Sequence, residues 1–254
     1  GEHRRCYLNF NCDSNSSEWT GLWRESTDAT STQSRPGSPE NALTGQISWR
    51  NNTSDITVPS DYASLRFWRN TSVASLTGTQ TATLTSGSLG YEWSPQYEQY
   101  MGSYPAGRVL LSSTDALSTF AGVDTHHLSL YKATSGALVF GAGTVQWAWG
   151  LDARHDRSAT QASSAPSPVM QQATVNLLAD MSAQPTTLQS GLVLAVKSLD
   201  VTAPTVAITS PADSASVGAG PVTVTGTAGD VGGTVGVVEV STDGTVWRPA
   251  TGRT

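Results

Sequence analysis

The sequence predicts an α/β body with β insertions over residues 1–198, followed by a partial all-β sandwich over residues 199–254. Three observations lead to this fold class. Ala137-Leu138-Val139-Phe140 is a short apolar run, typical of a strand buried on both faces of a sheet. A helix-like pattern follows over 168–183. Beyond residue 200, valine-rich alternating runs are separated by Pro, Gly and Asp turns, as in β-sandwiches. This tail is shorter than the about 100 residues of a full sandwich, so we expect it to be truncated.

The stretch over residues 137–152 is the expected centre of the body. We expect strand 137–142 in the interior of a sheet, where Gly141 and Gly143 let the backbone bend or approach another group closely. Trp147 and Trp149 are two residues apart, so an extended chain would direct them to the same side. Ligands of open α/β sheets bind beyond the carboxyl ends of the strands. The alternative is that these glycines and tryptophans only pack the edge of the sheet.

Two flanking segments are expected to be strands. His127–Lys132 alternates, and Thr134-Ser135-Gly136 would turn it into the central strand as a hairpin. Leu65–Arg69 alternates apolar and basic residues, which predicts a half-exposed strand.

The helix after the central loop has clear boundaries. Ser167 can cap it, Pro168 suits its first position, and Pro185 stops it. We expect it to pack on strand 137–142 through a face formed by Met170, Ala173, Thr174, Leu177, Leu178 and Met181.

Composition excludes some partners. Only 13% of the residues are charged, the net charge is -6, and no basic stripe is present, so nucleic acid is not an expected partner. No apolar run reaches the length of a membrane span. Cys6 and Cys12 can form one disulfide or both stay free, and a metal site needs more ligands than this pair. Gly1 is not a natural start, so we expect that a targeting segment can precede it.

Three motifs carry a family resemblance. They are PENALTG at Pro39–Gly45, LGYEW at Leu89–Trp93, and GAGTVQW at Gly141–Trp147 together with MQQATVNL at Met170–Leu177. Over roughly residues 18–195 the chain resembles the C-terminal region of the large (beta) subunit of N,N-dimethylformamidase, as found in large secreted actinobacterial proteins.

This resemblance implies a fold. The body would be an incomplete class I glutamine-amidotransferase-like α/β fold, with residues 137–184 as its last strand and helix. Residues 203–254 are similar to the start of a bacterial Ig-like repeat.

The resemblance also implies a chemistry, the hydrolysis of a small amide at one iron ion held by two tyrosine phenolates and one glutamate. The metal would polarise the amide carbonyl and lower the pKa of a bound water. The family's glutamate falls at Glu40, with Asn41 beside it as an orienting or substrate-contacting group. Residues 1–17 contain no counterpart of the tyrosine motifs, so we expect at most one of three ligands and an inactive fragment. Neither cysteine lies on a strand-to-helix turn, which argues against a thiol mechanism.

Other candidate residues flank these motifs. His155 can act as a general acid or base, or the loop around it can form a salt bridge through Arg154 or Arg157. Tyr91, Glu92 and Trp93 can stack on and hydrogen-bond a sugar or amide, with Trp147 as a further substrate contact. The alternative for the LGYEW motif is a buried aromatic pair with a solvated carboxylate.

A histidine pair, His126-His127, lies beside Asp124. It can contribute to a metal site, but a pair of this kind between a loop and a strand more often lies on the surface.

Two functions therefore stay open. The first is a secreted or cell-surface metal-dependent hydrolase that acts on a small amide C–N bond with iron as cofactor. The second is a non-catalytic secreted module that binds a cell-surface glycan or a host surface through exposed Trp and Tyr residues. The Ig-like tail fits both, and the coding sequence upstream of Gly1 would discriminate between them.

Overall fold

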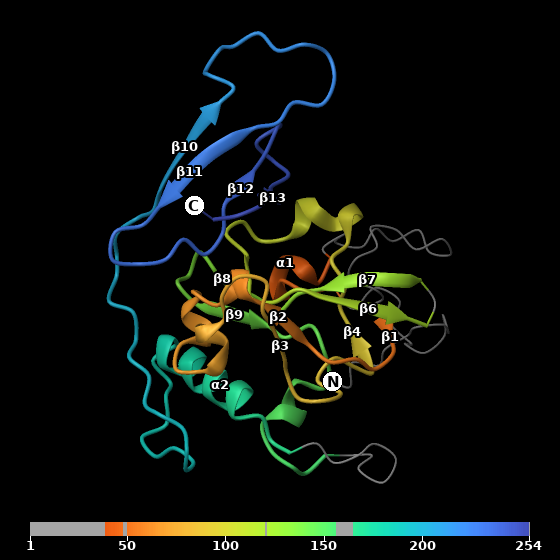
Figure 1. The fold of residues 1–254 in the computed structure, drawn as a ribbon, viewed down its shortest axis with the longest axis vertical. Coiled ribbons are helices and arrows are strands. Elements are labelled where there is room, and N and C mark those ends of the chain that lie inside the picture. The colour runs from red at the N-terminus through yellow and green to blue at the C-terminus, as the bar shows by residue number, and fades with distance from the viewer. Residues whose placement is uncertain (1–38, 48–49, 120, 156–164, 254) are drawn as a thin grey trace, which may run out of the picture.

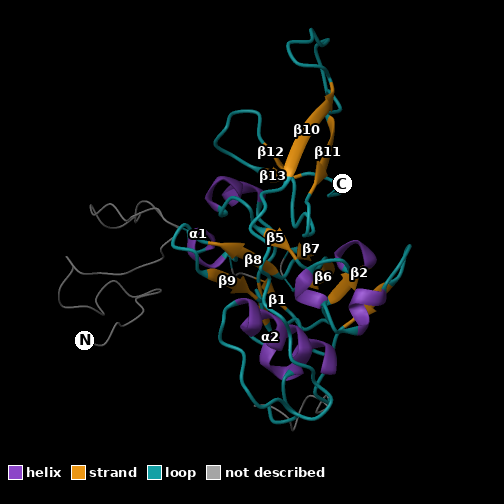
Figure 2. Cartoon of the chain, turned by 90° about the vertical axis from the view of Figure 1, so that its left-hand side faces the viewer, coloured by secondary structure: helices purple, strands orange, loops and turns teal. Residues whose placement is uncertain are grey.

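The computed structural model describes residues 39–47, 50–119, 121–155 and 165–253 (Figure 1). Cys6 and Cys12 lie outside these residues. Within the described part of the chain there are two α-helices, α1 (Asn41–Thr44) and α2 (Pro168–Asp180), and every strand pair is antiparallel. Figure 2 shows how much of the body is loop between small sheets.

The strands of the body form four small sheets within the described residues. They are β1 (Arg50–Asn51) with β4 (Glu92–Trp93), β2 (Thr57–Pro59) with β3 (Thr81–Thr83), β6 (Thr114–Ser118) with β7 (Gly122–His126), and β8 (Ser129–Lys132) between β5 (Val109–Leu110) and β9 (Leu138–Gly141).

The predicted hairpin is confirmed, but the predicted interior strand over 137–142 is wrong. β8 and β9 pair with Ser129 opposite Gly141, and Gly136 adopts φ +89° in the turn between them. This hairpin makes β9 antiparallel and puts it at the edge of its sheet, with Leu138 to Phe140 only half-buried. The described residues therefore do not show the parallel, helix-covered sheet of a glutamine-amidotransferase-like fold.

The apolar run in β9 is explained by an aromatic cluster instead of burial on two faces. Phe140 stacks on Phe67 with 5.3 Å between ring centroids, and Trp147 meets Phe140 edge-on at 5.4 Å. Aromatic pairs at these distances add stability beyond the area that they bury.

The predicted strand over Leu65–Arg69 is also wrong, because Arg66–Trp68 forms the 3-10 helix η3. In a strand, neighbouring side chains point to opposite faces. Here both Phe67 and Trp68 are buried, which a tight helical turn permits and a half-exposed strand does not. The indole N–H of Trp68 donates to Leu111 O at 2.8 Å, so the buried ring has its polar atom satisfied.

Helix α2 begins and caps as predicted. The Ser167 hydroxyl accepts from Met170 N at 3.3 Å, and Pro168 occupies the first turn. Helix α2 packs chiefly against η3 and not, as predicted, against strand 137–142. The buried Asn176 amide on α2 donates to Phe67 O in η3 at 2.9 Å.

The buried face of α2 is wider than predicted. Met170, Ala173 and Leu177 join the main core. On another side, Val175 and Ala179 are covered by the returning chain at Leu188, Leu192 and Ala195.

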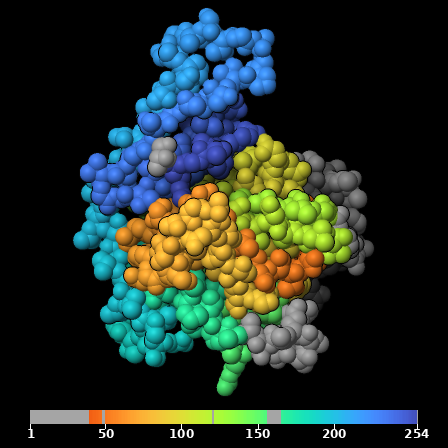
Figure 3. Space-filling model, in the orientation of Figure 1, coloured from red at the N-terminus to blue at the C-terminus, as the bar shows by residue number. Residues whose placement is uncertain are grey.

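A separate β unit follows Pro204, as predicted. It contains β10 (Thr205–Ser210) paired with β11 (Thr225–Gly229) and β12 (Glu239–Val240) paired with β13 (Arg248–Pro249). All six residues of β10 are exposed. In Figures 1 and 3 this blue unit projects from the upper end of the body. It contacts the body through the Arg248–Glu98 ion pair and through Glu239, whose carboxylate accepts from Gly107 N at 2.7 Å.

Candidate functional site

The loop that follows β9 is joined to the LGYEW segment by backbone hydrogen bonds. Ser94 N donates to Gly143 O at 2.7 Å, and Val145 N donates to Glu92 O at 3.2 Å. The structure thus brings together two motifs that are about fifty residues apart in the sequence, as their residue numbers show.

Gln46 reaches the same loop from the end of α1. Its amide nitrogen donates to Gly141 O at 2.8 Å and to Ser129 Oγ at 2.9 Å. A Cβ at Gly141 would lie 2.5 Å from Gln46 Cγ, and one at Gly143, where φ is +60°, would lie 2.6 Å from Gln46 Oε1. The expected close approach at the two glycines is therefore confirmed.

Gln46 is a residue that sequence reasoning missed. Its place directly after the PENALTG motif was the available indication. The sequence showed that something approaches the glycines but did not show which side chain it is.

The start of α2, which carries the MQQATVNL part of the third motif, packs against the same loop. Ser167 N donates to Gly150 O at 2.8 Å, and the Gln171 side chain donates to Leu151 O at 2.7 Å. A Cβ at Gly150 would lie 2.1 Å from the sulfur of Met170. The motifs that carry the family resemblance therefore meet around the loop over residues 141–151.

Glu40 and Asn41 lie at the start of α1, which packs beside β9 and the 3-10 helix η5 (Glu98–Ser103). Glu40 is half-buried, and its backbone carbonyl accepts from Thr44 N at 2.9 Å. Asn41 is fully buried and donates to Tyr100 O at 3.1 Å. The amide oxygen of Asn41 is buried without a hydrogen-bond partner in the part of the chain that the structure describes. The roles of Glu40 as a metal ligand and Asn41 as a substrate contact stay predictions.

Tyr91 and Glu92 are surface residues at the start of β4. Tyr91 is 42% exposed and Glu92 is exposed, whereas Trp93 is 1% exposed. The alternative of a buried aromatic pair therefore applies only to Trp93, whose ring stands edge-on to His126 at 6.3 Å. Tyr91 and Glu92 are accessible to a ligand, as their predicted role requires.

Trp147 and Trp149 point to different neighbours, because the extended chain that would direct them to one side does not form here. They lie in the 3-10 helix η6 (Trp147–Gly150), which is not extended. Trp147 packs into the aromatic cluster of Phe140, whereas Trp149 stacks on His155 with 5.0 Å between centroids and 12° between planes. Stacking fixes the orientation of the His155 imidazole.

His155 places one ring nitrogen inside the protein. Its Nε2 is buried and has no hydrogen-bond partner among the described residues. Arg154 N donates to Asp152 Oδ1 at 2.6 Å, while Asp156 and Arg157 lie outside the described residues. The general acid or base role of His155 stays a prediction.

The expectation that His126 and His127 lie on the surface is wrong. His126 ends β7 and is fully buried, with Nδ1 2.9 Å from Ser94 O. A carbonyl only accepts, so Nδ1 carries the proton and Nε2 is left as a buried acceptor without a partner among the described residues. Burial lowers the pKa of His126 to about 4 and also lowers the pKa of His127. Asp124 forms an ion pair with Arg50 instead.

His, Cys, Asp and Glu side chains do not gather into a metal site in the described part of the chain. No group of three or more His, Cys, Asp or Glu side chains there could hold a metal ion. Tyrosine phenolates are not among these side chains, so the expected iron site stays a prediction, with Glu40 as its one named ligand.

Comparison with known proteins identifies two regions. Residues 3–161 match the family model described as N,N-dimethylformamidase beta subunit-like, C-terminal, and residues 204–254 match a bacterial Ig domain. No curated protein and no solved structure matches the chain. Over the residues that the structure describes, no helix has the length and apolar character needed to cross a membrane. Because the first match covers more than half of the chain, and because its motifs pack around one loop, the chain belongs to the N,N-dimethylformamidase beta subunit-like family and carries its C-terminal region.

Proposed function

We propose that this chain works in a secreted, metal-dependent hydrolase that cleaves the C–N bond of a small amide. The observation that carries the proposal is the family match over residues 3–161. It is supported by the packing of the PENALTG, LGYEW and MQQATVNL motifs around residues 141–151, because side chains held by rigid contacts keep a defined geometry for chemistry.

In this proposal Glu40 supplies one carboxylate oxygen to an iron ion. Carboxylates are among the ligands that bind non-haem iron in proteins. We name no further ligand among the described residues, and we derive no catalytic step through the metal. When bound, the metal would supply a polarised amide carbonyl and an activated water.

The chain's own residues have roles that their surroundings support. His155 would accept or donate a proton at Nε2, because this atom has no hydrogen-bond partner among the described residues and the ring is fixed by Trp149. Tyr91 and Glu92 would contact the substrate from the exposed start of β4. Trp147, half-buried beside Phe140, and the buried Asn41 would shape the site.

Secretion is proposed from the tail. Bacterial Ig-like units are found along cell-surface and secreted enzymes, and the match over residues 204–254 supports such a location for this chain.

The test is an assay for amine release from a panel of small N-alkylamides, using the product of the whole open reading frame. We expect hydrolysis that falls about 100-fold in His155→Gln, because a positioned acid or base typically contributes that factor or more. Arg154→Gln, an exposed neighbour in the same loop, should leave the rate unchanged. Absence of hydrolysis together with retention on cell-wall glycans would contradict the proposal and favour the glycan-binding module, for which the exposed Tyr91 ring is suited.

A further inference from the structure

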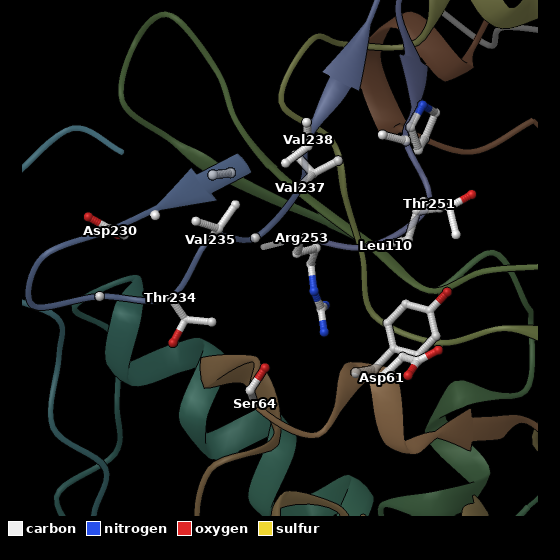
Figure 4. Close-up of a pocket in the computed structure, with 18 residues that line it drawn as sticks. Asp61, Ser64, Leu110, Asp230, Thr234, Val235, Val237, Val238, Thr251 and Arg253 are labelled. Atoms are coloured by element: carbon white, nitrogen blue, oxygen red, sulfur yellow. The ribbon is translucent and has the colours of Figure 1, made fainter. Parts of the chain in front are cut away.

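A cavity of about 740 Å³ lies where the Ig-like unit meets the body (Figure 4). The body contributes η2 (Ser60–Tyr62), Ser64 and Leu110 of β5. The Ig-like unit contributes residues 228–230, 233–238 and 249–253. Small-molecule sites typically occupy about 300–1,000 Å³ and often lie between structural units. The size and position of this cavity are therefore those of a ligand site.

Arg253 is the one cation among the residues that line the cavity. Figure 4 shows its side chain reaching from the Ig-like unit into the space above Ser64 and Asp61. The guanidinium lies 5.7 Å from the centre of the Tyr62 ring, and no hydrogen bond or ion pair joins it to another described residue. Its five N–H donors are therefore available to a ligand.

Burial makes this guanidinium a stronger receptor than a surface arginine. Removal from water lowers the pKa of Arg253, while the charge of Asp61 and the Tyr62 hydroxyl act in the opposite direction. The group stays positively charged, since the ordinary pKa of arginine is far above neutral pH. A charge that is partly removed from water interacts more strongly with an opposite charge than one in bulk solvent.

The remaining lining is mixed. Hydroxyl groups come from both sides of the cavity, from Ser64 on the body and from Thr234 and Thr251 on the Ig-like unit. Asp61 and Asp230 add carboxylates that can accept hydrogen bonds, and Leu110 adds apolar surface. A ligand that matches this lining carries one anionic group and several hydroxyls.

We propose that the cavity binds a sugar acid, with its carboxylate on Arg253 and its hydroxyls on Asp61 and Ser64. The planar guanidinium forms two parallel hydrogen bonds with a carboxylate, which a neutral sugar cannot accept in the same way. Asp61 accepts from sugar hydroxyls and repels a second negative charge on the ligand. The sugar acid can be free or can end a longer glycan.

The experiment titrates the full chain with sodium glucuronate by isothermal calorimetry. We expect glucose to bind at least about tenfold more weakly than glucuronate, a ratio that corresponds to loss of one charge-assisted pair. Arg253→Gln should weaken glucuronate binding by at least the same factor. Arg154→Gln, which removes an equal charge from an exposed loop outside the cavity, should bind as the unaltered chain does.

A second variant acts from the opposite wall. Ser64→Phe fills the cavity from an exposed position of the body without altering Arg253, and it should also abolish binding. A glucuronate-terminated oligosaccharide that binds more tightly than glucuronate would identify a glycan as the source, and equal affinity would identify the free acid. Absence of glucuronate binding, equal affinity for glucose, or undiminished binding by folded Arg253→Gln or Ser64→Phe would overturn the proposal.

Discussion

The body and the Ig-like unit both contain short antiparallel strands, but some side chains of these strands are buried in the body, whereas most are exposed in the Ig-like unit. Val58 in β2 is fully buried in the main core, whereas Val206 in β10 is 71% exposed. Two-stranded pairs are marginal in water unless another layer covers them. Strand pairing alone therefore does not stabilise either region, and the body differs because η3, α2 and the aromatic cluster of Phe67, Phe140 and Trp147 bury its strands.

The comparison extends to the polar groups. In the body, Gln46 and Asn176 are buried and join segments distant in sequence. In the Ig-like unit, polar contacts such as those of Asp243 with Thr245 N and Val246 N stay within one exposed turn. Long-range polar contacts therefore position the motifs. We expect the loss of such a contact to lower the free energy of unfolding of the body far more than a comparable change lowers that of the Ig-like unit.

The largest difference is expected for a matched tryptophan pair. Trp68→Ala removes a fully buried ring and its hydrogen bond to Leu111 O, so it should lower the free energy of unfolding by about 3–5 kcal/mol. Trp247→Ala removes a ring that is 42% exposed and should cost about 1 kcal/mol. Urea denaturation followed by circular dichroism measures both, and equal losses would contradict the contrast between the two regions.

Acid should destabilise the body specifically. The folded-state pKa of His126 is lowered to about 4 by burial, below the unfolded value near 6.5. As the pH falls below about 6.5, the unfolded chain binds a proton that the folded chain does not. The free energy of unfolding should therefore decrease by about 3 kcal/mol between pH 6.5 and 4.

The Ig-like unit supplies the contrast in that pH range, since residues 204–254 contain no histidine. His126→Asn retains a donor for Ser94 O but does not titrate, so it should reduce the slope of stability against pH, leaving the part that comes from His127. Urea midpoints at pH 7.5, 5.5 and 4.5 measure this slope. An unchanged slope in the variant would show that His126 does not titrate as described.

Glycine substitutions give the smallest expected difference. Gly141→Ala places a Cβ 2.5 Å from Gln46 Cγ and 2.7 Å from the Thr44 carbonyl, so it should cost about 1–3 kcal/mol. Gly218→Ala meets nothing within 4 Å and should change stability by less than about 0.5 kcal/mol. Thermal unfolding of both variants measures these two losses. Equal melting temperatures would show that the close contact between Gln46 and Gly141 does not stabilise the loop.

Local features were predictable from the sequence, and long-range ones were not. Ser167 and Pro168 mark the start of α2 because capping depends only on neighbouring residues, and the turn before β9 is equally local. The partners of β9 and η3 depend on residues far away, so an apolar run and an alternating pattern allowed the wrong sheet position and the wrong element.

The candidate site divides in the same way. The glycines at 141 and 143 indicated a close approach, but Gln46 as the approaching group follows from tertiary structure. The burial of His126 and the cavity beside Arg253 also depend on tertiary packing, and no local pattern marked them.

We propose that Glu40 binds iron in an amide hydrolase, and the iron content of the protein is the measurement that bears on this ligand role without an assay of activity. Glu40→Gln in the body keeps the size of the side chain and removes its charge, and Asp213→Asn makes the same kind of change at an exposed site in the Ig-like unit. We measure iron per chain by mass spectrometry in both variants of the product of the whole open reading frame, with circular dichroism as the folding control. We expect that Glu40→Gln loses its iron while Asp213→Asn retains about one ion per chain, as one mononuclear centre requires. Folded Glu40→Gln that retains iron at the level of the unaltered protein would contradict it.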